Sequence, residues 1–149
     1  MRIETTRFGV VEVDESALVN IPGGLLGFEE QTKYCLIQHR PSANFRWLQS
    51  TQEPSLAFVV VDPSEYFADY EIELSDRDVQ RLQLSGAEDA IILTILTIRD
   101  SGSDVSANLA APIVINSKNL IAAQVVLEDE RYQTRHVLAT AQNKHIAAA

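Results

Sequence analysis

The sequence is poor in cysteine and in long apolar runs. Its 149 residues contain one cysteine, Cys35, so no internal disulfide can form. Cys35 stands in the apolar run Y-C-L-I, where we expect a buried, unreactive side chain. No apolar run approaches the ~18 residues that a membrane-spanning helix needs. The opening residues, M-R-I-E-T-T-R-F, lack the apolar segment of a secretory signal. We therefore expect a cytoplasmic protein with no membrane partner.

Residues that commonly carry catalysis or bind metals are also few. The three histidines show no metal-ligand spacing: His39, His136 and His145. Cys35 and His39 lie four residues apart on one expected strand, which separates them by ~13 Å at ~3.3 Å per residue. That distance is too long for a nucleophile and its base. The consecutive acids at 128–130 could bind a hard cation such as Ca²⁺. A charged turn beside Arg131 explains them better, because no EF-hand spacing accompanies them.

The glycine-containing stretch G-G-L-L-G-F-E, Gly23 to Glu29, suggests a phosphate-binding loop. It lacks the Lys-Ser/Thr pair that contacts phosphates, and no helix-opening pattern follows it. We expect instead that the glycines permit a tight turn while Leu25, Leu26 and Phe28 pack into the core. Because none of the common catalytic, phosphate-binding or metal-binding motifs is present, we expect a protein that is not an enzyme and has no cofactor and no metal site.

Basic residues are scarce, and the acidic excess is concentrated in one part of the chain. The sequence has 12 Lys and Arg against 21 Asp and Glu, a net charge of −9. Ten acids and two arginines between Trp47 and Ile98 give that segment −8, which leaves −1 for the rest. The negative electrostatic field of this segment attracts basic surfaces and repels phosphate backbones. Direct binding to nucleic acid is therefore disfavoured. The alternative is a solvated face that serves solubility.

The length and the apolar fraction, 46%, are those of one globular domain with a substantial core. We expect a single domain over residues 1–138. The remaining residues, A-T-A-Q-N-K-H-I-A-A-A, have no periodic apolar face, so we predict a flexible C-terminal tail at 139–149.

Short strands bounded by turn formers dominate the pattern. The most strongly β-branched run, 91–98, predicts a central strand or a strand buried on both faces, because none of its side chains favours exposure to water. One helix is predicted near residues 75–83, with Ser75 as its N-cap and Gly86 marking its end. The fold class is therefore mainly β, an antiparallel barrel-like or sandwich fold with one short helix. The other strands are expected at 2–6, 10–13, 17–21, 34–38, 45–49, 56–61, 112–116 and 120–127.

Six segments occur in a familiar order along nearly the whole chain. They are I-E-T-T-R-F-G-V-V-E-V-D-E (3–15), I-P-G-G-L-L-G-F-E (21–29), F-R-W-L-Q-S-T-Q-E-P-S-L-A-F-V-V-V-D-P (45–63), Y-E-I-E-L-S-D-R-D-V (70–79), A-N-L-A-A-P-I-V-I-N (107–116) and L-E-D-E-R-Y-Q-T-R-H (127–136). No single motif is diagnostic, but the ordered set resembles the FliW family of bacterial flagellar assembly factors. One departure is His136-Val137-Leu138, where the family often has His-Pro-Leu.

The resemblance implies a small β-barrel-like protein without enzymatic activity that binds two protein partners. One partner is flagellin, captured in the cytoplasm through its C-terminal region. The other is CsrA, a basic, dimeric RNA-binding protein that represses translation of flagellin mRNA. Binding to CsrA away from its RNA surface would relieve the repression allosterically once flagellin has been exported.

Charge and placement, taken with this resemblance, select the candidate partner-binding residues. Five acids are expected to contribute to CsrA binding: Asp62, Glu65, Asp69, Glu71 and Glu73. Three aromatic residues are expected to anchor an amphipathic flagellin helix, unless they pack against the adjoining helix: Tyr66, Phe67 and Tyr70. Asn108 and Asn116 are polar candidates that flank the strand A-A-P-I-V-I.

Other functions remain open at this point. A β-barrel could bind a small molecule in its mouth. A small hydrolase could use a carboxylate pair, although no feature of the sequence supports it. A flagellin chaperone without a CsrA role is a further alternative.

Overall fold

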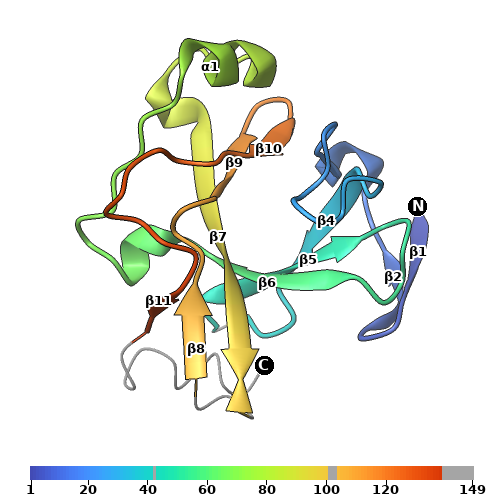
Figure 1. Ribbon diagram of the computed structural model, residues 1–149. Helices are drawn as coiled ribbons and strands as arrows, with labels where there is room; N and C mark the ends of the chain where they lie inside the picture. The colour runs from blue at the N-terminus through green and yellow to red at the C-terminus, as the bar shows by residue number, and fades with distance from the viewer. Residues whose placement is uncertain (42, 101–103, 139–149) are drawn as a thin grey trace.

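Antiparallel strands joined by long connections form the scaffold of the molecule (Figure 1). The computed structural model describes residues 1–41, 43–100 and 104–138. Within these residues the chain forms eleven strands, one α-helix and three short 3-10 turns. The predicted mainly β class is confirmed. The predicted tail at 139–149 lies outside the described residues.

Seven strands follow one another around a strongly curled sheet, in the order β10-β9-β7-β6-β5-β4-β3. An isolated parallel bridge joins Asn20 in β3 to Ile121 beside β10, and the Asn20 N–H donates to the Leu120 carbonyl at 2.9 Å. The first and last strands of the order therefore meet, which makes the sheet barrel-like. The bounds are β3 Val19–Asn20, β4 Lys33–Ile37, β5 Phe45–Ser50, β6 Ala57–Val61, β7 Ala90–Arg99, β9 Ile113–Asn116 and β10 Ala122–Gln124.

Four further strands lie outside this ring, two in a separate sheet and two joined to the ring at β7. β1 (Arg2–Thr5) and β2 (Gly9–Glu12) form the predicted opening hairpin. β8 (Asp104–Ala107) pairs with the second half of β7, and β9 pairs with the first half. β11 (His136–Val137) pairs with β8. The sequence pattern missed β8 and β11, because neither has a long β-branched or alternating run.

Side chains from all seven ring strands fill the interior of the barrel. This barrel core consists of Val19, Ile21, Leu25, Tyr34, Leu48, Val60, Leu93, Ile113, Ile115 and Ala122. Alternation along each strand sends the intervening residues to the outside of the sheet. In β6, for example, Val60 belongs to the barrel core, whereas Val59 and Val61 belong to a second cluster.

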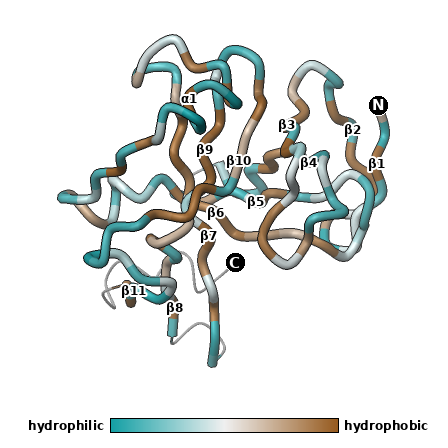
Figure 2. Tube along the Cα trace, turned by 45° about the horizontal axis from the view of Figure 1, so that its top comes forward, coloured by the Kyte–Doolittle hydropathy of each residue, from teal (hydrophilic) through white to brown (hydrophobic). Residues whose placement is uncertain are grey.

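Two outer clusters cover the sheet from outside. The second core gathers on β5, β6, β7 and β8, and includes Phe45, Trp47, Val61, Leu96 and Leu109. The third core joins Leu82 of the helix to Val114, Ala123 and Val125. Apolar segments accordingly run through β6, β7 and β9, while the helix and outer loops are mostly hydrophilic (Figure 2).

Two expectations about buried runs need correction. Leu25 is buried, but Leu26 and Phe28 are 58% and 42% exposed, so they do not pack into the core. The run at 91–98 is the central strand β7, as predicted, yet Ile91 and Thr97 are exposed. Both errors have the same cause. An apolar residue type favours burial, but the backbone of a turn or of a strand end decides whether the side chain points to the core or to solvent.

The helix α1 (Asp76–Leu82) lies within the predicted range 75–83, and only the residue expected to end it differs. Ser75 caps it, since its hydroxyl accepts from the Asp78 N–H at 3.1 Å. Gly86 does not end it. Gln83 takes the left-handed conformation at φ 58°, a role that glycine usually has.

Asn116, at the end of β9, holds the C-terminus of α1 against the barrel. Its side chain is 2% exposed, and Nδ2 donates to the carbonyls of Leu82 (2.9 Å) and Gln83 (3.1 Å). Oδ1 accepts from the Lys118 N–H at 2.9 Å. These bonds satisfy carbonyls that the helix end leaves unpaired. Asn116 is thus engaged within the fold.

Replacing this side chain should loosen the helix. Asn116→Ala removes three hydrogen bonds and leaves buried carbonyls unpaired, so the free energy of unfolding should fall by about 2–3 kcal/mol in urea titrations. Asn119→Ala is the matched control, because Asn119 is exposed and accepts one bond, from the Ile121 N–H. If both variants lose the same stability, Asn116 does not have this role.

Candidate functional site

The chain leaves the sheet between the neighbouring strands β6 and β7, and this connection, residues 62–89, carries most of the acidic excess. It holds nine of the ten acids found between Trp47 and Ile98. Loops supported by a rigid scaffold are common locations for binding sites. The acidic connection is therefore the candidate site, and eight of the ten predicted binding residues lie in it.

The first part of the connection closes over the second core. Asp62 caps the 3-10 turn η2 (Pro63–Glu65), because its Oδ1 accepts from the Ser64 N–H at 2.9 Å and from the Ser64 hydroxyl at 2.7 Å. Tyr66 and Phe67 follow, half-buried against the second core, and the Phe67 ring centroid lies 6.0 Å from that of His136. Glu65 is exposed.

Two tyrosines fix the next part of the connection. The Tyr70 hydroxyl donates to the Leu109 carbonyl at 2.7 Å, and its ring meets that of Tyr132 edge to face at 4.6 Å. The Tyr132 hydroxyl accepts from the Glu71 N–H at 3.0 Å and donates to the Asp69 carbonyl at 3.4 Å. Burial raises the pKa of Tyr70, so its hydroxyl remains a donor at neutral pH.

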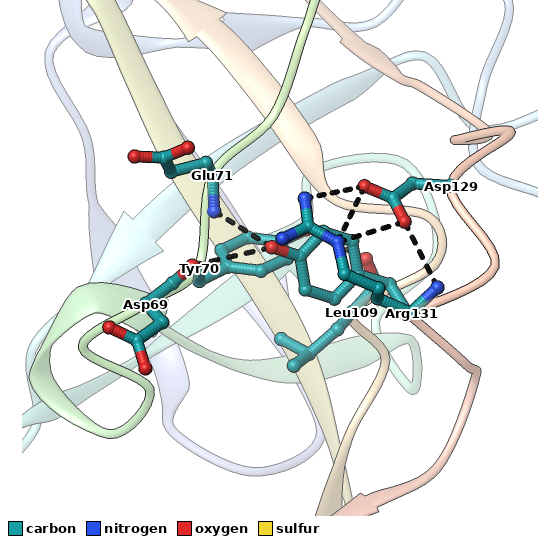
Figure 3. A network of polar contacts seen from close by, with 7 residues as sticks. Asp69, Tyr70, Glu71, Leu109, Asp129 and Arg131 are labelled. Carbon is teal, nitrogen blue, oxygen red and sulfur yellow. Dashed lines mark hydrogen bonds and ion pairs between the residues drawn. The ribbon is translucent and has the colours of Figure 1, made fainter.

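This tyrosine clamp leaves two carboxylates outside. Asp69 and Glu71 are exposed, and their carboxylates point away from the two rings (Figure 3). The backbone is therefore held while the charges stay available in water. Across the clamp, Arg131 pairs with Asp129 at 2.7 Å and lies 5.1 Å from the centre of the Tyr132 ring. Hydrogen bonds from Arg131 lower the pKa of Asp129.

Beyond the clamp, a groove opens between residues 71–75 and 125–131. Its volume is about 530 Å³. Ile72, Leu74 and Leu127 supply half-buried apolar surface, and Val126 is 63% exposed. Among the described residues that line it, one is basic, Arg131, and five are acidic: Glu71, Glu73, Asp78, Glu128 and Asp129. We call this feature the acidic groove.

The charges within the acidic groove are unevenly compensated. Asp129 pairs with Arg131, and Asp78 pairs with Arg81 at 2.8 Å. Glu71, Glu73 and Glu128 are exposed at the rim. A negative rim around apolar surface suits a basic protein segment, since charges at a rim act mainly on the association rate and on partner choice.

The structure groups some of the predicted residues and separates others. Glu71 and Glu73 line the acidic groove, and Asp69 flanks it on the same segment. Asn108 lies away from this lining, where its Oδ1 accepts from the Ala111 N–H at 3.1 Å. Asn116 is buried behind α1. Sequence reasoning missed the second wall, which lies within residues 125–131. The acids at 128–130 gave a signal, but nothing local indicated that Glu128 and Asp129 line the same groove as Glu71 and Glu73.

Comparison with known proteins fixes the family. The sequence model of the family described as FliW protein matches residues 2–138. The chain belongs to the FliW family. It is 42% identical over 136 residues to the flagellar assembly factor FliW of Syntrophus aciditrophicus, covering 91% of this chain and 86% of that one. It is 39% identical to the factor of the same name in Geobacillus kaustophilus, covering 93% of this chain and 95% of that one.

A solved structure supports the same assignment. The chain superposes on a crystal structure of the flagellar assembly factor FliW with a TM-score of 0.85 and 38% identity, covering 92% of this chain and 96% of the other. Within the described parts of this FliW-family chain, no helix has the length and apolar character needed to cross a bilayer. In the same residues, no three His, Cys, Asp or Glu side chains are placed to hold a metal ion.

The tyrosine clamp can be tested by removing one hydroxyl. Tyr132→Phe keeps the ring but removes the partner of the Glu71 N–H, so the free energy of unfolding should fall by about 1 kcal/mol. The Glu71 amide should exchange with deuterium faster. Tyr34→Phe is the control, because the buried Tyr34 hydroxyl has no hydrogen-bond partner among the described residues. Unchanged exchange at Glu71 in Tyr132→Phe would show that the clamp does not hold this segment.

Proposed function

We propose that this protein is a non-enzymatic flagellar assembly factor of the cytoplasm that binds two protein partners in turn. It holds the C-terminal region of flagellin before export. When free, it binds CsrA allosterically and relieves repression of flagellin mRNA translation. Family membership supports the flagellar role, and the acidic groove is the observation that carries the proposed contact with CsrA.

Electrostatics favour a basic partner at the acidic groove. The groove combines five acids with one arginine, in a chain of net charge −9. Such a field accelerates encounter with a cationic protein and disfavours contact with RNA itself. Contact with the protein rather than with its RNA agrees with allosteric antagonism. Because the rim charges are exposed, their contribution should weaken as salt screens them.

Flagellin needs apolar contact in addition to charge. A helix bound in a groove is held by apolar anchors spaced along one face. Tyr66, Phe67 and Tyr70 are half-buried, and they pack against the second core rather than against α1. Their outer edges remain the proposed anchors for the flagellin C-terminal region. The acidic groove supplies further apolar contact area for the flagellin segment, at Ile72, Leu74 and Val126.

A small-molecule-binding barrel gains little support. The interior of the ring is occupied by the barrel core, with side chains from each of its seven strands. Three hollows lie where the connections meet the sheet, and Leu93 is the one barrel-core residue among the residues that line them.

Calorimetry with the organism's own CsrA tests the proposal. The protein is titrated into CsrA at low and at moderate salt, with and without the flagellin C-terminal segment. Binding that weakens with salt and disappears when flagellin is present supports exchange of partners with an electrostatic contribution. If flagellin binds and CsrA does not, the protein is a flagellin chaperone only. If neither binds, the proposed function is wrong.

Reversing two rim charges tests the contribution of the groove. Glu71→Lys with Glu73→Lys should weaken CsrA binding at least about tenfold, or about 1.4 kcal/mol, and should reduce its salt dependence. Glu4→Lys with Glu15→Lys is the control with the same change in net charge, at exposed positions that do not line the groove. Equal affinity and equal salt dependence in the two double variants would contradict a role for the acidic groove.

A further inference from the structure

Residues 24–28, here called the apolar loop, present two large apolar side chains to solvent. Leu26 is 58% exposed and Phe28 is 42% exposed. The loop lies between β3 and β4 and forms no part of the acidic groove. Exposed apolar residues are common singly, but two on one short, ordered turn call for an explanation.

The loop is held in one shape by its backbone. Gly24 and Gly27 have φ values of 67° and 86°, which favour glycine, and a Cβ on Gly24 would lie 2.5 Å from the Glu29 Cα. The Phe28 N–H donates to the Leu25 carbonyl at 2.7 Å, and the Leu26 N–H donates to Gln124 Oε1 in β10 at 2.8 Å. Leu26 and Phe28 are therefore preorganised, which lowers the entropic cost of binding.

An acidic hollow lies beside Phe28, two residues along the loop from Leu26. The Phe28 ring packs edge to face on Phe58, with centroids 5.2 Å apart. Next to it is a hollow of about 460 Å³, with apolar surface from Phe28 and Leu56. Among the described residues that line it, none is basic and three are acidic: Glu29, Glu30 and Glu53.

We propose that the apolar loop and its hollow form a second docking surface, for a protein segment that carries an apolar side chain flanked by Lys or Arg. The apolar side chain would contact Leu26 and Phe28, and the flanking cations would meet Glu30 and Glu53. A second copy of this chain is a poor occupant, because the acidic hollow would face another molecule of net charge −9. The hollow and the acidic groove share no lining residue, so the surface is additional to the one proposed for CsrA.

Two synthetic peptides test the chemistry without either flagellar partner. Both carry the same central leucine and phenylalanine, flanked by lysines in one peptide and by glutamates in the other. Titrated into the labelled full-length protein, the lysine peptide should shift the amide NMR signals of residues 24–31 and 53–56, and added salt should reduce the effect. The glutamate peptide should leave them unchanged.

Single variants decide whether these residues bind the peptide. Leu26→Ser should weaken binding about tenfold, because it removes an exposed apolar contact without touching the core. Glu30→Lys should weaken it and flatten its salt dependence. Two control variants should bind as the unaltered protein does: Val137→Ser, at a valine that is 66% exposed elsewhere, and Glu88→Lys, at an exposed glutamate that lines neither the hollow nor the acidic groove. Phe28→Ser is avoided because it would disturb Phe58.

Several outcomes would overturn the proposal. They are no binding of the lysine peptide at millimolar concentration, shifts that map to residues 71–75 and 125–131, equal binding of the glutamate peptide, and full binding by Leu26→Ser. Concentration-dependent shifts of residues 24–31 in the absence of peptide would assign the surface to a second copy instead. Each result is independent of whether CsrA or flagellin binds.

Discussion

The ten-residue strand β7 is the constraint on which the rest of the fold depends. It pairs with β6 through residues 94–96, with β9 through its first half and with β8 through its second half. Its side chains reach all three clusters, since Leu93 belongs to the barrel core, Leu96 to the second core, and Ile92 packs against the third. A strand whose two faces pack against different clusters has little freedom to shift its register, because a shift by one residue would exchange those faces.

This rigidity explains how an acidic segment can be exposed and still ordered. The chain leaves β6 at residue 62 and returns to the neighbouring strand β7 at residue 90. Between them, apolar and aromatic side chains hold the connection to the outer clusters, while its carboxylates remain in water. Tyr70 and Tyr132 join the connection to the segment around residues 109–132. The two walls of the acidic groove, distant in sequence, are thereby fixed relative to each other.

Local patterns predicted what depends on local physics. The β-branched run of β7, the hairpin around Arg7-Phe8-Gly9 and the Ser75 cap were all visible in the sequence, and the order of segments identified the family. Features that depend on tertiary contacts were not visible in the sequence. No local pattern indicates that residues 71–75 and 125–131 line the same groove. Nor does one indicate that Gln83 ends α1 in the left-handed conformation, which glutamine does not favour. Leu26 and Phe28 were assigned to the core from their composition, whereas the turn exposes them.

We propose the acidic groove as the surface to which a basic partner binds. Hydrogen–deuterium exchange of the full-length protein, free and saturated with CsrA, tests it most directly. We expect slower exchange at residues 71–75 and 125–131 in the complex, and no change in the β1–β2 hairpin. Protection confined to the hairpin, or to any surface outside the groove, would contradict the account even if CsrA binds tightly.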